Sequence, residues 1–192
     1  GINLALHFTA WRRASAQPYF VDPELKVYAS LLFAFSVLVS FGLFFTGTYD
    51  TLASSFRYGT FQVISAMTTT GFTTASFYTW PGFVPVLLIF IAFIGGCAGS
   101  TAGGMKVIRI ILLYRQSARE IRRLIHPHAV IQIRVGDQQA SSAVMDAVGG
   151  FFFLYIATFT LVTVLLNATG IDSVSAFSAA AASITNLGPG LS

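Results

Sequence analysis

The chain has 192 residues, of which 55% are hydrophobic and only 9% are charged, and its formal net charge is +4. Soluble globular domains carry about 25% charged residues, so this composition excludes an ordinary soluble domain and indicates a lipid bilayer as the solvent. Its basic residues lie beside apolar runs without interleaved aromatic residues, so membrane topology, and not nucleic-acid binding, explains the charge.

Three apolar stretches predict membrane-spanning helices. The first, Val27 to Phe45, has no charge and is close to the roughly 20 residues that cross a bilayer. The second, Phe83 to Tyr114, is longer than one span, and the glycine-rich segment Gly95 to Gly104 interrupts it. Because glycine disfavours a continuous helix, we expect one transmembrane helix that is broken in its middle. The third span is Val148 to Leu166.

Two shorter segments, Leu52 to Met67 and Ser173 to Ile184, predict helices that enter the membrane and turn back. They are too short or too polar to cross, so they must be buried in protein. Asp50 and Asp172 precede them and are expected to cap their first turns rather than to bind ions.

The basic residues predict the orientation. Lys and Arg are enriched on the cytoplasmic side of membrane proteins, so both basic flanks are expected there and the segments 46–82 and 167–192 are expected outside. The segment Gly1 to Trp11 looks like the end of a preceding helix. The residues of the two basic flanks are Arg12, Arg13, Lys26, Arg115, Arg119, Arg122, Arg123 and Arg134.

The sequence contains an internal repeat. The stretch "SAMTTTGF" (Ser65 to Phe72) aligns with "ASITNLGP" (Ala182 to Pro189), which places Gly71 over Gly188 at a distance of 117 residues. In both copies a span, a short helix and a loop with a central glycine follow in the same order. The second copy stops where a further span is expected, so we expect the chain to be part of a longer protein.

The order of span, short helix, loop and span is the plan of a potassium-channel pore. Backbone carbonyls replace the water of a permeating cation without trapping it, and threonine hydroxyls add further oxygen ligands. Glycine permits the positive φ that turns carbonyls toward one axis. The partly negative C-terminal ends of the short helices favour a cation. The fold class that we predict is therefore an all-α membrane protein with repeated units of span, re-entrant pore helix, filter loop and span.

Four motifs carry a resemblance to a known family. They are "TTTGF" (Thr68 to Phe72), "GGCAGSTAGGMKVIRI" (Gly95 to Ile110), "RQSAREIRRLIHPHAVIQIRV" (Arg115 to Val135) and "TNLGPG" (Thr185 to Gly190). The chain resembles the TrkH/TrkG/KtrB superfamily of bacterial potassium-uptake proteins, and most closely its TrkH branch. The resemblance covers nearly the whole chain and corresponds to the third pore repeat and the first part of the fourth.

The resemblance implies a pathway surrounded by four non-identical repeats in one chain, of which this chain holds too few to conduct. It implies a potassium ion, and no other cofactor, bound at Thr69, Thr70, Asn186 and Leu187. The resemblance also divides the chain into four parts. Residues 1–26 would be the end of a helix and a cytoplasmic loop, and residues 27–114 would be a pore repeat. Residues 115–147 would be a cytoplasmic connector, and residues 148–192 would be a truncated repeat. Carried over by position, the filter residues are Thr69, Thr70, Gly71, Phe72, Asn186, Leu187, Gly188 and Pro189.

The broken helix is expected to supply a gate, with a simple packing kink as the alternative. Non-helical backbone at membrane depth must be buried or line a wet cavity, which places the loop below the filter. Lys106 would repel cations if it faces the pore, or extend toward the cytoplasm if it does not. The gating residues are expected to be Gly95, Gly96, Gly99, Ser100, Thr101, Gly103, Gly104 and Lys106.

The family also implies partners. These are the lipid bilayer of the bacterial inner membrane, a second copy of the full-length protein, and a cytoplasmic nucleotide-binding regulatory subunit of TrkA type. The stretch Arg115 to Arg134 either contacts that subunit or only anchors the topology.

Two other functions stay open at this stage. A secondary cation transporter would bind its substrate at the broken helix, but it needs coupling carboxylates, and the three spans contain none. An enzyme would use Ser100 or Thr101 as nucleophile and requires a base, whereas all three histidines lie in expected cytoplasmic segments. His126 and His128 are expected to be loop residues and Cys97 a small buried hydrophobe. We therefore expect no enzymatic activity.

Overall fold

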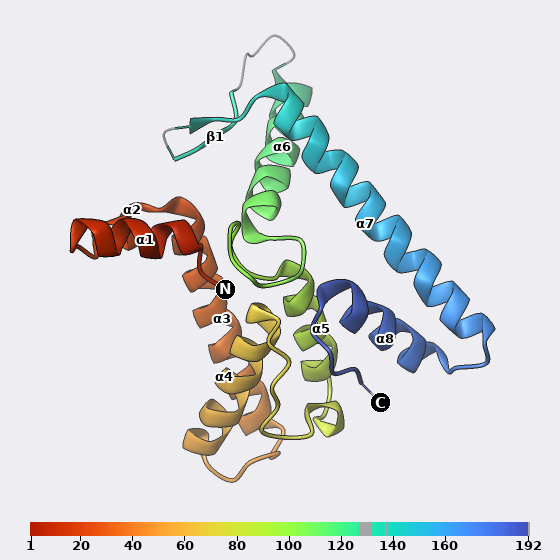
Figure 1. Cartoon of the computed structure of the whole chain (residues 1–192). Helices are drawn as coiled ribbons and strands as arrows, with labels where there is room; N and C mark the ends of the chain where they lie inside the picture. The colour runs from red at the N-terminus through yellow and green to blue at the C-terminus, as the bar shows by residue number, and fades with distance from the viewer. Residues whose placement is uncertain (127–131, 137, 192) are drawn as a thin grey trace.

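A computed structural model of the chain describes residues 1–126, 132–136 and 138–191. These residues are mostly helical, and one short antiparallel hairpin pairs Arg134 with Gln139 (Figure 1). In chain order the elements are α1 (Leu4–Arg13), α2 (Gln17–Val21), α3 (Pro23–Phe45), α4 (Leu52–Thr68), the 3-10 helix η1 (Phe77–Thr79), α5 (Val84–Ile94), α6 (Val107–Ile125), β1 (Arg134–Val135), β2 (Gln138–Gln139), α7 (Ser142–Ala168) and α8 (Ser173–Thr185).

The helices α3 and α7 are long and apolar enough to cross a membrane, with 23 and 27 residues. Both begin earlier than the apolar runs indicate because polar residues cap them. The Asp22 carboxylate accepts a hydrogen bond from Leu25 N at 2.7 Å, and the Ser141 hydroxyl accepts one from Val144 N at 3.3 Å. Each cap allows several polar residues to join the helix ahead of its apolar part.

The short helices α4 and α8 match the expected segments to within one residue at either end, and they pack against α3 and α7 respectively. The cap predicted at Asp172 is confirmed, because its carboxylate accepts from Ser175 N at 3.0 Å. This bond holds the pKa of Asp172 below its usual value. The cap predicted at Asp50 is wrong. Thr51 directly precedes the first helical residue, and its hydroxyl accepts from Ser54 N at 3.2 Å.

A non-helical loop separates α5 from α6, and Figure 1 shows it as a wide turn below α6. Backbone bonds close its base, from Met105 N to Phe93 O at 2.8 Å and from Lys106 N to Ile94 O at 3.0 Å. Beyond the loop, α6 does not stop at Tyr114, since it continues as an amphipathic basic helix to Ile125.

The N-terminal helix also differs from its expected bounds. It does not cover the whole of Gly1 to Trp11, because it begins at Leu4 and ends at Arg13. Asn3 fixes this start, since its side-chain oxygen accepts from Ala5 N at 2.8 Å.

The helix α5 is apolar on all sides and lies between two groups of helices. One side contributes Leu88 and Ile91 to a core with α3 and α4, and the expected burial of Cys97 in this core is confirmed. The other side contributes Ile89 and Phe93 to a second cluster with α7 and α8. α5 therefore fixes the distance between the ends of α4 and α8.

The cap of α4 gives a test of this local structure. Replacing Thr51 with Ala should lower the stability of the detergent-solubilised full-length protein by about 1 kcal/mol, since an orphan N–H loses its acceptor. Asp50→Ala is the matched control and should have a smaller effect. Thermal unfolding of both variants measures the difference, and an equal loss for the two would contradict the assignment of Thr51.

Candidate functional site

The two repeated loops share an unusual backbone conformation. Thr69 follows α4 in the left-handed region with φ +51°, and Asn186 follows α8 with φ +56°. Two residues further on, Gly71 and Gly188 have φ of +75° and +94°. These φ values agree with the expectation that the glycines take positive φ, and the left-handed residues before them were not foreseen.

The hydrogen bonds at the two helix ends also repeat with the spacing of 117 residues. In each copy a threonine hydroxyl donates to the carbonyl four residues earlier, and two backbone N–H groups close the last turn. The bonds of the first copy are Thr68 Oγ1 to Ile64 O at 2.6 Å, Thr69 N to Ala66 O at 3.1 Å and Thr70 N to Ser65 O at 3.0 Å. Those of the second are Thr185 Oγ1 to Ala181 O at 2.7 Å, Asn186 N to Ser183 O at 3.3 Å and Leu187 N to Ala182 O at 2.9 Å.

The two loops meet in space at Gly71. A Cβ at this position would collide with the carbonyl oxygen of Leu187 and would lie 3.2 Å from Cδ of Pro189. Neither the φ nor the space at Gly71 tolerates a side chain. Residues 117 positions apart in the sequence therefore form one site.

The remaining residues expected in the filter have different surroundings. Leu187 is buried, whereas Thr70, Asn186, Gly188 and Phe72 are exposed in this chain. The Thr70 hydroxyl lies 3.1 Å from the Thr68 hydroxyl. All these residues lie on the two loops that follow α4 and α8.

The glycine-rich loop between α5 and α6 lies against both helix ends. Gly103 N donates to the Thr69 hydroxyl at 2.6 Å, and a Cβ on Gly103 would collide with the Thr185 carbonyl oxygen. Gly103 therefore sits between the C-terminal ends of α4 and α8. The glycine-rich loop thus contacts both segments that were expected to form the filter, while its role as a gate stays a prediction.

The side chain of Lys106 bonds to the loop itself, an arrangement that the sequence did not indicate. Its ammonium group folds back over the loop and donates to the carbonyl of Ser100 at 3.1 Å and to the carbonyl of Ala102. This arrangement needs a left-handed backbone at Lys106, with φ +74°. The cation therefore stabilises the loop's own carbonyls.

The loop hydroxyls do not form a nucleophilic site in the described part of the chain. Ser100 Oγ donates to the Cys97 carbonyl at 2.6 Å, while Thr101 is exposed. His7 pairs with the Tyr19 hydroxyl at 2.7 Å. Within the described residues, no group of three or more His, Cys, Asp and Glu side chains could hold a metal ion.

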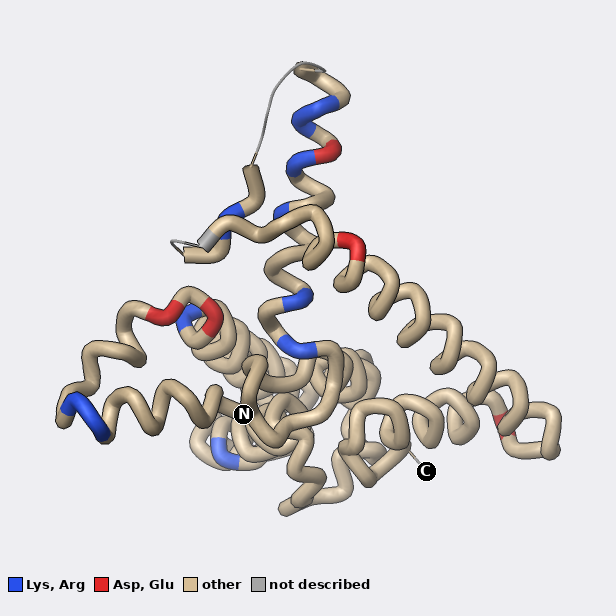
Figure 2. The backbone as a smooth tube through the Cα atoms, turned by 45° about the horizontal axis from the view of Figure 1, so that its top comes forward, with Lys and Arg blue, Asp and Glu red and all other residues tan. Residues whose placement is uncertain are grey.

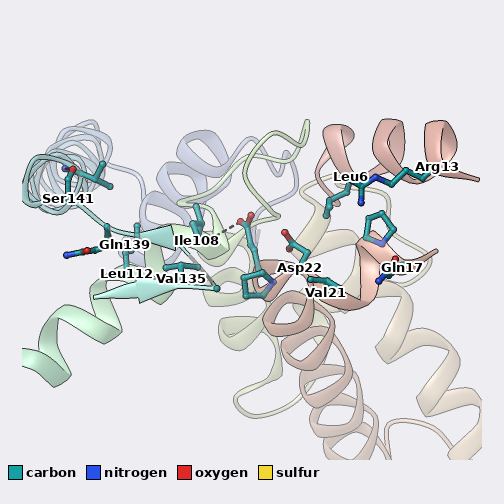
Figure 3. Close-up of a pocket in the computed structure, with 16 residues that line it drawn as sticks. Leu6, Arg13, Gln17, Val21, Asp22, Ile108, Leu112, Val135, Gln139 and Ser141 are labelled. Atoms are coloured by element: carbon teal, nitrogen blue, oxygen red, sulfur yellow. Dashed lines mark hydrogen bonds between the residues drawn. The ribbon is translucent and has the colours of Figure 1, made fainter. Parts of the chain in front are cut away.

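Glu24 is a site residue that the sequence reasoning missed. Its side chain is buried, and Oε1 accepts hydrogen bonds from Ala98 N at 2.7 Å and from Ile108 N at 3.0 Å. The only signal in the sequence was an acid in the first turn of a helix, which usually means a favourable dipole contact and nothing more. Glu24 also lines a cavity of about 780 Å³. Figure 3 labels Asp22 and Ile108 in the wall of the same cavity.

The basic residues gather along α6 and around the first helices (Figure 2). In the C-terminal half of α6, Arg119 pairs with Glu120 at 2.9 Å. Near the start of the helix, Arg109 lies over the ring of Phe151, at 3.9 Å from its centroid. His126 follows the last residue of α6, and His128 lies outside the described residues. The arginines in the C-terminal half of α6 therefore lie at the surface of the chain.

Comparison with known proteins identifies the family. A family model described as "TrkH: Cation transport protein" matches residues 24–192. The Trk system potassium uptake protein TrkH of Halomonas elongata is 46% identical over 189 residues, which are 98% of this chain and 39% of that protein. The protein TrkG of Escherichia coli, of the same system, is 35% identical, over 97% of this chain and 39% of its own length.

A solved structure is similar throughout. The crystal structure of the potassium transporter TrkH from Vibrio parahaemolyticus matches with a TM-score of 0.94 and 47% identity, over 99% of this chain and 41% of that one. The chain thus spans about 40% of the length of the relatives it matches. These matches confirm the resemblance carried by the four motifs, and with the two membrane-length apolar helices they indicate a membrane protein. The chain belongs to the TrkH family of cation transport proteins.

Proposed function

We propose that the chain forms part of a pathway for potassium uptake across the bacterial inner membrane. The observation that carries this proposal is the meeting of two loops with the same backbone conformation at Gly71 and Leu187. The names of the relatives, Trk system potassium uptake proteins, support the choice of ion. Because the chain spans about 40% of those relatives, the rest of the pathway belongs to a longer protein.

In this proposal the two loops form two walls of a selectivity filter. Carbonyl and hydroxyl oxygens of Thr69, Thr70, Asn186 and Leu187 replace the water around the ion. The Thr69 hydroxyl already accepts from Gly103 N, so Thr69 contributes its carbonyl rather than its hydroxyl. The C-terminal ends of α4 and α8 add partial negative charge beside the ion.

The loop Gly95 to Gly104 is the gate of the pathway. Its contacts with Thr69 and Thr185 support a position directly inward of the filter. Its hydrogen bonds to the rest of the chain include Cys97 N to Gly1 O, Leu4 N to Gly99 O and Gly103 N to Thr69 Oγ1, and a change of loop conformation has to break bonds of this kind. No coupled transport is needed for this arrangement, and we do not favour the secondary transporter.

The proposal also includes orientation and assembly. The basic C-terminal half of α6 faces the cytoplasm, and the loops after α4 and α8 open to the outside of the cell, as the distribution of Lys and Arg favours. The full-length protein is a homodimer that binds a nucleotide-binding regulatory subunit of TrkA type. Arg119, Arg122 and Arg123 are the proposed contact with that subunit.

The direct test is ion flux from the full-length protein in liposomes under defined gradients of K⁺, Na⁺ and protons. We expect K⁺ flux that follows its own gradient and does not depend on the other two. Flux that requires a proton or Na⁺ gradient would favour the transporter instead.

The filter assignment predicts the effect of a single substitution at Gly71. Gly71→Ser should weaken the discrimination of K⁺ over Na⁺, because a side chain there displaces the Leu187 carbonyl and strains a backbone at φ +75°. Gly170→Ser is the matched control, since Gly170 has φ +93° in the turn between α7 and α8 and open space around it. Reversal potentials in mixed K⁺ and Na⁺ that are the same for both variants would contradict the assignment.

The gate assignment predicts that a shorter loop conducts more. Removal of Ala98 to Ala102 should raise K⁺ flux and reduce its dependence on the regulatory subunit, while the bond between Phe93 and Met105 keeps the loop ends together. Replacing the same five residues by Gly-Gly-Ser-Gly-Gly keeps the length and should leave flux near wild type. A shortened protein with normal selectivity, flux and regulation would mean that the loop is structural.

The proposed partner contact predicts a loss of binding without a loss of selectivity. Reversing the charge of Arg119, Arg122 and Arg123 to Glu should reduce co-purification of the regulatory subunit. Reversal of Arg12 and Arg13 on α1 is the control at another basic site, with two reversed charges instead of three. Unchanged co-purification after the α6 reversal would remove this contact from the proposal.

A further inference from the structure

Among the residues that the structure describes, Glu24 is the one acidic residue that is buried, with 7% of its surface exposed. One of its two hydrogen-bond donors lies within the break between α5 and α6, and the other lies just after it. Ala98 belongs to the loop, whereas Ile108 belongs to the first turn of α6. One carboxylate oxygen therefore binds three separate parts of the fold together, since Glu24 itself is in the first turn of α3.

These bonds supply acceptors that the backbone lacks. The first N–H groups of a helix have no partner within it, and Ile108 N is one of these in α6. Ala98 N lies in a loop that makes no helical bonds. Hydrogen bonds to a charged acceptor are about twice as strong as neutral ones, and they strengthen further away from water.

The opposite side of the loop is held by the opposite charge. Lys106 binds the carbonyls of Ser100 and Ala102, so one N–H group of the loop is held by an acidic side chain and two of its C=O groups by a basic one. Lys106 is part of the segment that it binds, whereas Glu24 lies 74 residues away from Ala98 in the sequence. Within the described residues, Glu24 is therefore the charged side chain that connects the loop to another helix.

We propose that Glu24 is the positioning residue that latches the loop to the start of α3 and to the first turn of α6. The inference deepens the proposed gate and rests on it for its effect on flux. While the carboxylate holds both N–H groups, the loop and α6 move together. A movement of α3 or α6 that breaks the pair of bonds releases the Ala98 part of the loop from α3, while Gly103 N still donates to the Thr69 hydroxyl.

The position of Glu24 allows such a movement to begin near the first helices and α6, where the basic residues gather. The residue lines the cavity between α1, α2, α6 and the start of α7, and Asp22 lies in the same wall (Figure 3). Asp22 caps α3 through Leu25 N and makes no hydrogen bond to the loop within the described residues. The two neighbouring acids thus have separate structural roles, which makes Asp22 a matched control.

Cys97 provides a native reporter for the latch. Its side chain is 0% exposed, and it directly precedes Ala98, whose N–H the carboxylate holds. In the full-length protein with any other cysteines replaced by serine, the rate of Cys97 modification by a small maleimide measures how often the loop opens. Glu24→Leu removes both bonds, Glu24→Gln keeps the acceptor without its charge, and Asp22→Ala removes the cap of α3 alone.

We expect Glu24→Leu to raise the modification rate by about tenfold or more, and Glu24→Gln by a smaller factor, because bonds to a charged acceptor are lost or weakened. Asp22→Ala should leave the rate near wild type. An unchanged rate in a folded Glu24→Leu variant, or an equal rise in Asp22→Ala, would overturn the latch. Should Glu24→Leu fail to fold, an unchanged rate in Glu24→Gln would overturn it.

Flux measurements separate the latch from the gate. K⁺ flux without the regulatory subunit should rise in Glu24→Gln together with the modification rate. A faster modification with wild-type flux would support the latch and contradict the assignment of the loop as the gate.

Discussion

The structure depends on one constraint, which is that backbone polar groups away from water need partners. Helical structure breaks off between Ile94 and Val107, so the N–H and C=O groups of the residues between them must find other partners. Glu24, Lys106 and the Thr69 hydroxyl all act as such partners. The contacts that define the site are thus the same contacts that make the break tolerable.

The same constraint explains why the two repeats share a conformation while their side chains differ. The last turns of α4 and α8 are closed by matching backbone bonds, and Thr68 and Thr185 each return a hydroxyl to the preceding turn. The residue that follows can be Thr69 or Asn186, because the helix end and not the side chain sets its φ. Only the glycine two positions further on is restricted, by its φ and, at Gly71, by lack of space.

Much of this arrangement could be predicted from the sequence because it follows from local rules. Runs of apolar residues give α3, α7 and the short helices, and the repeated glycines give the loops. Glu24 could not be predicted, because its partners lie 74 and 84 residues away and its local sequence is that of any helix start. The fold of Lys106 back over the loop likewise depends on carbonyls that only the folded loop presents. The charge of the C-terminal half of α6 indicates topology and predicts only a connector, although its amphipathic pattern also favours a helix.

The helix α5 connects these local and long-range parts. One side of it packs with Val63 and Met67 of α4, and the other packs with Tyr155 of α7 and Ala181 of α8. Because its last residue, Ile94, directly precedes the loop, one helix sets both the distance between the ends of α4 and α8 and the position of the loop. A change in the loop can therefore leave the proposed filter in place, provided that α5 stays still and only the contacts with Glu24 and α6 are released.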